Sequence, residues 1–170
     1  MRTKYVIVLP YDKSWKLNFE KIKEELLKTL GDTVLRIEHV GSTSVEGLSA
    51  KPIIDIDIVI KDYSAFELVK EKLALIEYVH EGDLGIKDRE AFKYVGKEDL
   101  QQHHLYVCPQ NSAELARHIT FRNYLRNNQD AVKEYSHVKE EAARLFPEDI
   151  DKYIEYKSPC IETLYRKCGL

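Results

Sequence analysis

Two aspartates, Asp55 and Asp57, interrupt a run of isoleucine and valine and are the residues of this chain with the clearest potential for chemistry. Residues 53–60 are predicted to form a strand, because the run is short and β-branched and follows Pro52, which a strand tolerates at its first position. Side chains alternate along a strand, so both aspartates share one face, with Cα atoms about 6.6 to 7 Å apart. The isoleucines of the run point to the other face.

This spacing lets two carboxylates bind one hard cation. Burying two unpaired like charges is strongly unfavourable, so such a pair faces water, takes up a proton or binds a metal. Mg²⁺ prefers oxygen ligands at about 2.1 Å and often uses one or two carboxylates together with substrate phosphates. The alternative is a half-buried strand with a solvated acidic face, and the pair by itself slightly favours that alternative.

A Gly-Ser turn precedes the aspartate strand. Gly41 and Ser42 stand between a strand predicted over residues 34–40 and a short segment, residues 42–45, that can begin a helical turn. Exposed amides at such a turn can hold a phosphate, and glycine lets a ligand approach the backbone closely. A Gly-Ser pair is commonly only a turn. Its combination with an Asp-Ile-Asp strand after 12 intervening residues is much rarer.

This combination resembles the nucleotidyltransferase superfamily of the DNA polymerase beta type, whose signature is a Gly-Ser or Gly-Gly turn followed by an Asp-x-Asp or Asp-x-Glu strand. More closely, the chain resembles the GrpB family, through the segments PYDKSWKLNFE, EHVGSTSVEGLSAKPIIDIDI, HHLYVCP, FRNYLRNN and KEYSHVK. These segments span nearly the whole chain. The resemblance implies an α/β (α+β) fold, with a nucleotidyltransferase-like mixed β-sheet flanked by helices and a C-terminal helical layer.

The resemblance also implies a reaction. A Mg²⁺-dependent nucleotidyltransferase would move a nucleoside monophosphate from a nucleoside triphosphate to an unidentified acceptor, which is a small molecule, a protein or an RNA end. Gly41 and Ser42 would hold the triphosphate, and Asp55 and Asp57 would bind Mg²⁺. The acceptor would attack the α-phosphorus and release pyrophosphate, and two metal ions about 4 Å apart would stabilise the attacking and leaving oxygens.

One part of the superfamily pattern is missing. Active members usually carry a third carboxylate on a later strand, whereas the strand predicted over residues 104–108 places His104, Tyr106 and Cys108 on one face. His104 is the candidate replacement, as a ligand or proton acceptor, because an unperturbed imidazole titrates near neutral pH. A hydrogen-bonded structural histidine is an equally good interpretation. Glu38 is the other candidate, although alternation groups it with Arg36 and allows an ordinary surface carboxylate.

Cations fall at helical positions where the apolar pattern predicts hydrophobic residues. In the helix predicted over residues 112–127, Arg122, Arg126 and His118 lie within the apolar face, whereas Arg117 points elsewhere and is predicted to be solvated. Long cationic side chains often extend from such a face to water or pair with carboxylates inside the fold. A purely structural role is therefore open for each of them.

Four cations are predicted to contact phosphate. Arg122 and Lys157 fall at basic positions of the GrpB-like pattern, and Lys157 lies near the middle of an apolar stripe; arginine suits bidentate phosphate contacts and lysine acts as a point charge. Lys51 and Arg89 join them from loops, where exposure to solvent is the default. Lys139 lies near the edge of another apolar stripe and is assigned no role.

Hydrophobic periodicity predicts the elements that position these residues. A helix is expected from an N-cap at Ser14 to Leu30, with Gly31 ending it. The pair Ser158 and Pro159 can begin a new helix near the C-terminus. Further strands are predicted over residues 91–96 and 104–108, and further helices over 66–76, 112–127, 131–146 and 149–168. We interpret residues 1–170 as one nucleotidyltransferase domain, with a core over about 1–110 and a helical part over about 111–170.

Bulk properties restrict the function classes. The 26 Lys and Arg residues against 29 Asp and Glu give a net charge of −3, so neither duplex nucleic acid nor a membrane is expected as a partner. No run approaches the roughly 20 apolar residues of a spanning helix. Three cysteines without close pairing predict reduced thiols and a cytoplasmic location.

Two other functions compete with nucleotidyl transfer. A catalytically silent nucleotide-binding or regulatory protein on the same fold would explain the missing third carboxylate. A histidine-centred hydrolase with a transition metal, using His103 or His104, is a further alternative. Its support is thin, because the six histidines show no metal-ligand spacing such as His-Glu-x-x-His.

Overall fold

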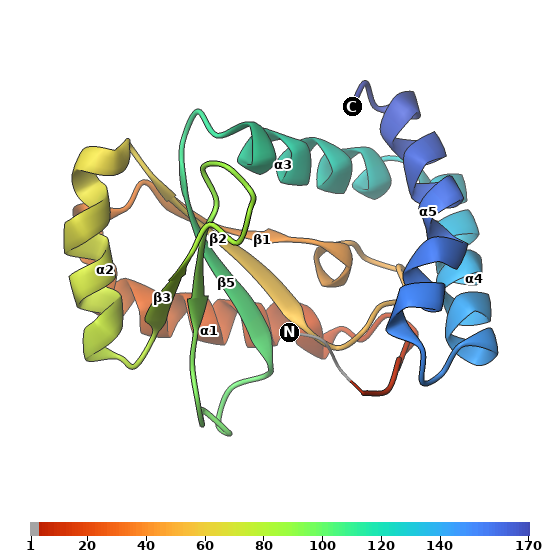
Figure 1. The fold of residues 1–170 in the computed structure, drawn as a ribbon, viewed down its shortest axis with the longest axis horizontal. Coiled ribbons are helices and arrows are strands. Elements are labelled where there is room, and N and C mark those ends of the chain that lie inside the picture. Colours follow the sequence, from red (N-terminus) through yellow and green to blue (C-terminus); the bar gives the residue numbers. More distant parts are fainter. Residues whose placement is uncertain (1–3) are drawn as a thin grey trace.

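Five strands form one mixed sheet in the order β1-β2-β5-β4-β3, in which β2 and β5 run parallel and the other neighbours run antiparallel (Figure 1). The structure is a computed structural model that describes residues 4–170. The strands are β1 (Arg36–Val40), β2 (Ile54–Ile60), β3 (Val79–Gly82), β4 (Glu90–Lys93) and β5 (His103–Pro109). The helices are α1 (Ser14–Leu30), α2 (Phe66–Leu75), α3 (Ala113–Arg126), α4 (Gln129–Leu145) and α5 (Ile150–Lys167).

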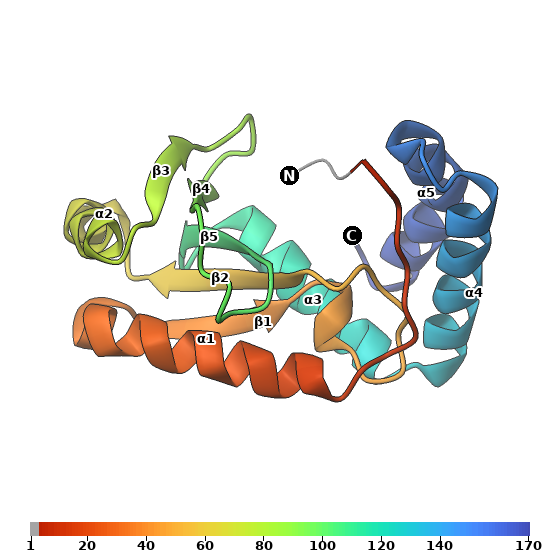
Figure 2. The ribbon, with the colours of Figure 1, turned by 90° about the horizontal axis from the view of Figure 1, so that it is seen from below.

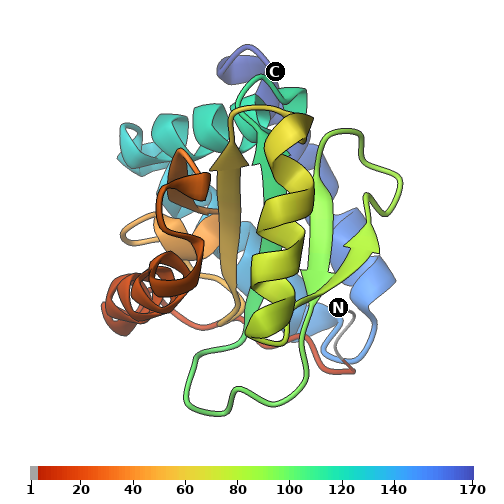
Figure 3. The same ribbon diagram turned by 90° about the vertical axis from the view of Figure 1, so that its left-hand side faces the viewer.

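The two faces of β2 receive different partners. Its isoleucines pack with apolar residues of α1 and α2 in the largest buried cluster, whereas Val59 packs with Leu115 of α3 on the other face. α2 lies in front of the sheet in Figure 3. Figure 2 shows α4 and α5 side by side beyond the end of the sheet at which β2 begins. The predicted mixed sheet with flanking helices and a C-terminal helical layer is confirmed.

Two expectations about individual elements are wrong, and one strand was missed. Ser14 is the first residue of α1 and not its N-cap; Lys13 holds that position, and the Asp12 carboxylate accepts a hydrogen bond from the Ser14 amide over 2.8 Å. The pair Ser158 and Pro159 does not begin a new helix, because α5 continues through both residues. Strand β3 was not predicted, since its four residues are too few to show a clear alternation.

Two further findings concern residues 4–170. All three cysteines are free thiols. No helix there has the length and apolar character that crossing a membrane requires.

Candidate functional site

The predicted Gly-Ser turn lies directly against Asp55. Gly41 has φ 71° and ψ −175°, and a Cβ atom there would overlap with the Asp55 carboxylate. Only glycine fits both the backbone conformation and the space. The next residues form a 3-10 turn, Ser42–Ser44, as predicted. Arg126 holds this turn, because its Nε and Nη2 donate to the Ser44 carbonyl over 3.0 and 2.8 Å.

Asp55 pairs with His104 across neighbouring parallel strands. The two residues are register partners on β2 and β5, and His104 Nδ1 lies 2.9 Å from Asp55 Oδ1. Their side chains are 26% and 33% exposed for His104 and Asp55, respectively. His104 Nε2 is buried and has no hydrogen-bond partner among the described residues. The carboxylate can therefore orient the imidazole while leaving the second nitrogen available.

Asp57 is fully buried and interacts with α3. His118 Nδ1 donates to Asp57 Oδ2 over 2.6 Å, and His118 Nε2 lies 3.1 Å from Glu114 Oε1. Burial raises the pKa of Asp57. Burial alone would lower the pKa of His118, but the hydrogen bond and the charge of Asp57 raise it. The pair thus holds a proton firmly, and the predicted alternative of a solvated acidic face is wrong for Asp57.

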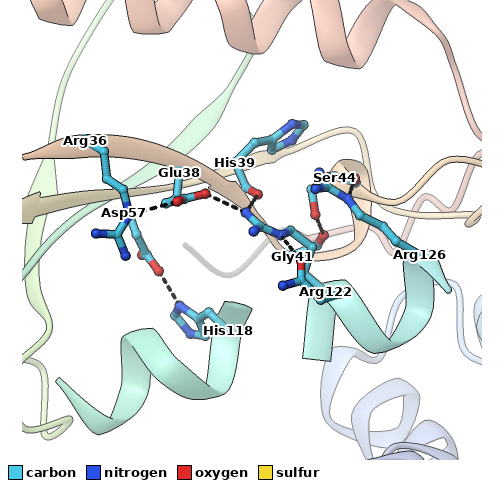
Figure 4. Close-up of polar contacts among 10 residues, drawn as sticks. Arg36, Glu38, His39, Gly41, Ser44, Asp57, His118, Arg122 and Arg126 are labelled. Carbon is cyan, nitrogen blue, oxygen red and sulfur yellow. Dashed lines mark hydrogen bonds and ion pairs between the residues drawn. The ribbon is translucent and has the colours of Figure 1, made fainter. Parts of the chain in front are cut away.

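Glu38 faces the same side of the sheet as Asp57, its register partner on β1. Arg122 Nη1 donates to Glu38 Oε2 over 2.7 Å and to the His39 carbonyl over 3.0 Å, and Arg36 Nε donates to Glu38 Oε1 over 2.9 Å (Figure 4). Burial acts to raise the pKa of Glu38, but the hydrogen bonds from both arginines lower it. Glu38 is therefore a fixed carboxylate of this network, and its interpretation as an ordinary surface residue is wrong.

A cavity of about 200 Å³, which we call the lysine cavity, opens beside Asp55. Lys139 is only 4% exposed; its Nζ donates to Ser42 Oγ and, over 3.3 Å, to the Ser49 carbonyl. Burial lowers the pKa of Lys139 well below its ordinary value. The lining residues are Ser42, Thr43, Ala50, Lys51, Ile53, Asp55, His104, Lys139, Tyr153 and Lys157.

Lys51 and Lys157 lie on the same aromatic ring of this cavity. Their Nζ atoms are 5.7 and 4.8 Å from the Tyr153 ring centroid, respectively. Burial, with a smaller contribution from Lys51, lowers the pKa of Lys157 to about 8. The structure thus brings together both predicted lysines and adds Lys139, which sequence reasoning missed. The available signal was a lysine at the edge of an apolar stripe, which more often extends to water.

A second cavity of about 190 Å³, which we call the aromatic cavity, lies under α3 and shares only Ser42 and Asp55 with the lysine cavity. Arg117 was predicted to be solvated, and its side chain is 45% exposed, yet its guanidinium lies 4.7 Å from the Tyr165 ring centroid. The lining residues are Gly41, Ser42, Asp55, Arg117, His118, Phe121, Arg122, Leu125, Tyr135 and Tyr165.

Arg89 lies apart from both cavities. Its guanidinium stacks 4.3 Å from the ring centroid of Tyr106, which is the β5 register partner of Asp57. Its Nε is buried without a hydrogen-bond partner in the described part of the chain. Arg89 therefore contributes positive charge near Asp57 but does not line the space beside Asp55. Its predicted contact with phosphate stays a prediction.

The donor set fits a metal that is bound together with substrate. Asp57 Oδ1 is buried and has no hydrogen-bond partner within residues 4–170, which is the condition of an oxygen that a cation could take. In the same residues, no three His, Cys, Asp or Glu side chains converge closely enough to hold an ion by themselves. Two carboxylates completed by phosphate oxygens and water are typical of Mg²⁺.

Comparisons with known proteins place the chain among close relatives. The model of the GrpB protein family matches residues 5–167. The UPF0157 protein YqkA of Bacillus subtilis is 33% identical over 93% of the chain, which spans 46% of YqkA. The glutamate-rich protein GrpB of Alkalihalophilus pseudofirmus is 33% identical over 94% of the chain and 93% of its own length. The crystal structure of GrpB from Enterococcus faecalis is 32% identical, with a TM-score of 0.82 over 95% of this chain and 96% of that one.

More distant solved structures share the fold. The GLD-2/RNP-8 complex aligns with a TM-score of 0.61 at 14% identity, over 95% of this chain and 62% of that one. Cid1, solved with its short product ApU, aligns with a TM-score of 0.53 at 10% identity, over 76% of this chain and 41% of that one. The fold is therefore nucleotidyltransferase-like, as the resemblance to that superfamily implied.

Proposed function

The chain belongs to the GrpB family, and from this premise we propose that it is a Mg²⁺-dependent nucleotidyltransferase that moves a nucleoside monophosphate from a nucleoside triphosphate to an acceptor. One observation carries the proposal. The Asp55 carboxylate lies against the Gly41 turn and lines a cavity to which, among residues 4–170, three lysines and no second carboxylate contribute. Such an excess of positive charge beside a carboxylate suits a metal-bound triphosphate.

Each side of the site has a role in this reaction. Gly41, Ser42 and the lysine cavity would hold the phosphates, with Lys157 and Lys51 as point charges. Asp55 and Asp57 would hold Mg²⁺, which would neutralise charge on the phosphates. His104 Nε2, oriented through Asp55, would serve there as a hydrogen-bond donor to a phosphate oxygen or as a proton acceptor.

Arg122 has a positioning role in this scheme. Its Nη1 donates to Glu38 and to the backbone of β1, which holds α3 against β1, and α3 supplies His118 to Asp57. The predicted contact of Arg122 with phosphate stays a prediction. A guanidinium fixed in this way adds positive charge beside Gly41 and Asp55, both of which line the same cavity as Arg122.

The test is a thermal-shift titration with ATP, GTP, CTP and UTP, with and without Mg²⁺, on the wild type and on an Asp55→Asn, Asp57→Asn double variant. A ligand that binds only the folded state raises its stability by about 2.7 kcal/mol at 100 times the dissociation constant, a shift of several degrees. We expect a Mg²⁺-dependent rise with at least one nucleotide and its loss in the double variant.

The matched control exchanges two exposed carboxylates, Asp99→Asn with Asp130→Asn. It removes the same formal charge away from the site and should leave the nucleotide response intact. The absence of any shift in the wild type, with nucleotides well above cellular concentrations, would contradict the proposal. If a nucleotide does raise the stability of the wild type, pyrophosphate release across a panel of acceptors would identify the reaction.

A catalytically silent nucleotide-binding or regulatory protein is the second candidate. The hydrogen bond between His118 and Asp57 favours it, because one oxygen of that carboxylate already has a partner. This function predicts triphosphate binding without turnover for every acceptor tried. Pyrophosphate release that disappears in Asp55→Asn would exclude it.

A further inference from the structure

Asp55 stands at the junction of two cavities of nearly equal size but different chemistry. The lysine cavity and the aromatic cavity measure about 200 and 190 Å³ and have only Ser42 and Asp55 in common. In an in-line displacement at phosphorus, the attacking and leaving oxygens lie on opposite sides of the reacting atom. If pyrophosphate leaves toward the lysines, the acceptor must approach the opposite side of the phosphorus, and the aromatic cavity is the second space that Asp55 lines.

We propose, on the basis of the function proposed above, that the aromatic cavity is the acceptor subsite and that it takes a small ring-bearing acid, which attacks through a carboxylate or phosphate oxygen. Three aromatic rings form its walls: the Phe121 ring is 4.7 Å from that of Tyr165 and 6.1 Å from that of Tyr135, measured between centroids. These walls suit a flat apolar body.

The charges around the aromatic cavity favour an anion. Arg117 and Arg122 both line it, against the single carboxylate of Asp55. Arg117 Nη1 is 3.7 Å from Glu114, a loose pair that a ligand can compete with, and its guanidinium already lies on Tyr165. A planar acid on these rings would therefore find a guanidinium of matching geometry beside it.

The histidines near the aromatic cavity favour an acceptor whose attacking oxygen is already ionised. His118 is the imidazole of this cavity, and both of its nitrogens are bonded to carboxylates, at 2.6 Å from Asp57 and 3.1 Å from Glu114. Both nitrogens therefore already have partners, and neither is free to bind an acceptor hydroxyl. His104, whose Nε2 is available, lines the lysine cavity and not this one. An acceptor without a proton to lose meets this constraint.

The reaction balances without another reagent. The anionic oxygen of the acceptor forms a bond to the α-phosphorus, and the bond from that phosphorus to the bridging oxygen of the β-phosphate breaks. The electron pair leaves with pyrophosphate into the lysine cavity. No atom is oxidised or reduced, no proton is transferred, and the product is a mixed anhydride of the acid and the nucleoside monophosphate.

The size of the aromatic cavity restricts the acceptor further. Pockets for drug-sized ligands usually measure about 300 to 1,000 Å³, whereas this cavity measures about 190 Å³. A single substituted ring with one acidic group matches that space. A terminal nucleotide of an RNA, with base, ribose and phosphate, is larger.

Three probes of similar size test the proposal: benzoate, phenyl phosphate and the neutral benzyl alcohol. Their binding is measured by isothermal titration calorimetry with Mg²⁺ and a non-hydrolysable nucleoside triphosphate analogue present. We expect at least one acid to bind about tenfold more tightly than benzyl alcohol, because a hydrogen bond to a charged group is lost in the alcohol. The two acids distinguish a carboxylate from a phosphate acceptor.

Variants assign the binding to one cavity. Phe121→Trp, which fills the aromatic cavity, and Arg117→Gln, at a half-exposed position that tolerates change, should both weaken acid binding about tenfold or more and leave the nucleotide response intact. Lys157→Met should weaken the nucleotide response and leave acid binding intact. Arg144→Gln and Lys152→Met, whose side chains are 71% and 63% exposed, are the matched controls.

Each of the other possible outcomes overturns either the acceptor subsite, the assignment of the two cavities or the proposed function. Nucleotide binding without acid binding, or equal binding of acid and alcohol, overturns the acceptor subsite alone. Loss of nucleotide binding in Phe121→Trp, with acid binding kept, means that the cavities have exchanged roles. Displacement of the acid by a short oligonucleotide assigns the cavity to an RNA end. The absence of nucleotide binding in the wild type overturns the proposed function itself, whatever the acids do.

Discussion

The two faces of β2 show two different ways of filling a protein interior. On one face, Ile56 and Ile58 are completely buried among apolar side chains of α1 and α2. On the other face, Asp57 is equally buried, but it is held by a hydrogen-bonded histidine from α3. The apolar face requires only hydrophobic residues of suitable volume, whereas the polar face requires a particular partner for each charge. A substitution should therefore be judged by the face on which it falls.

The largest expected effect comes from placing a carboxylate on the apolar face of β2. In Ile58→Asp, a carboxylate enters a site with no partner, and we expect the free energy of unfolding to fall by more than about 5 kcal/mol, so that the chain loses cooperative folding. The control Ile58→Val removes one methylene and should cost about 1 kcal/mol. Urea unfolding followed by circular dichroism measures both. A folded Ile58→Asp protein of near wild-type stability would remove the distinction between the faces.

Breaking one buried pair should have the next largest effect. His118→Leu leaves Asp57 without its partner, and we expect a loss of about 3 to 5 kcal/mol at pH 7. The double variant Asp57→Leu, His118→Leu should recover most of that loss, because two apolar side chains replace the pair. His137, whose side chain is 79% exposed, pairs with Glu141 on the surface. The control His137→Leu should therefore change stability by less than about 0.5 kcal/mol. Equal losses in the single and double variants would contradict the pairwise account.

His39 sharpens the comparison, because it is a titratable group on the apolar side. Its ring stacks 4.5 Å from Phe19, and burial, with smaller opposing and reinforcing charges nearby, lowers its pKa to about 4. Because the folded-state pKa lies below the unfolded value near 6.5, the contribution of neutral His39 to stability is fully present above about pH 6.5. It is lost progressively as the pH falls from there through the folded-state pKa of about 4. His39 should thus reduce the free energy of unfolding by about 3 kcal/mol between pH 7 and pH 4.

The variant His39→Phe keeps the ring stack and removes this titration. We expect its stability to fall less steeply than that of the wild type between pH 7 and pH 4, measured by urea unfolding at each pH. His137→Phe, which changes an exposed imidazole, should retain the wild-type slope. An identical pH dependence in all three proteins would show that His39 is protonated without cost in the folded state.

The same comparison explains how far sequence reasoning could reach. Alternation along residues 53–60 is a local property, and it separated the aspartates from the isoleucines correctly. The turn at Gly41 and Ser42 was also local, and the structure adds why glycine is required there: the Asp55 carboxylate occupies the space of a side chain. Local patterns therefore predicted the apolar face and the turn that lies against Asp55.

The partners of the charges could not be predicted in this way. His118 and Arg122 are 61 and 84 positions away in the chain from Asp57 and Glu38, respectively, the residues they bind. Helical periodicity placed both on the inner face of α3 but did not indicate which carboxylate each would meet. Lys139 had the same ambiguity, since a lysine at the edge of a stripe either reaches water or enters the fold. The group that each of these side chains contacts depends on how elements distant in the sequence pack together, and local patterns do not show this.

The smallest effect compares an enclosed carboxylate with an exposed one. Glu38→Gln leaves Arg122 and Arg36 without their charged acceptor, and we expect a loss of about 1 to 2 kcal/mol, because the Glu38 side chain is only 22% exposed. Glu24→Gln breaks a pair at 3.9 Å whose side chains are 64% and 74% exposed, and it should cost less than about 0.5 kcal/mol. Urea unfolding at low and high salt separates them, since salt screens only the exposed pair effectively. Equal and salt-sensitive losses would mean that water reaches Glu38 freely, and that the polar face is an ordinary surface at its β1 edge.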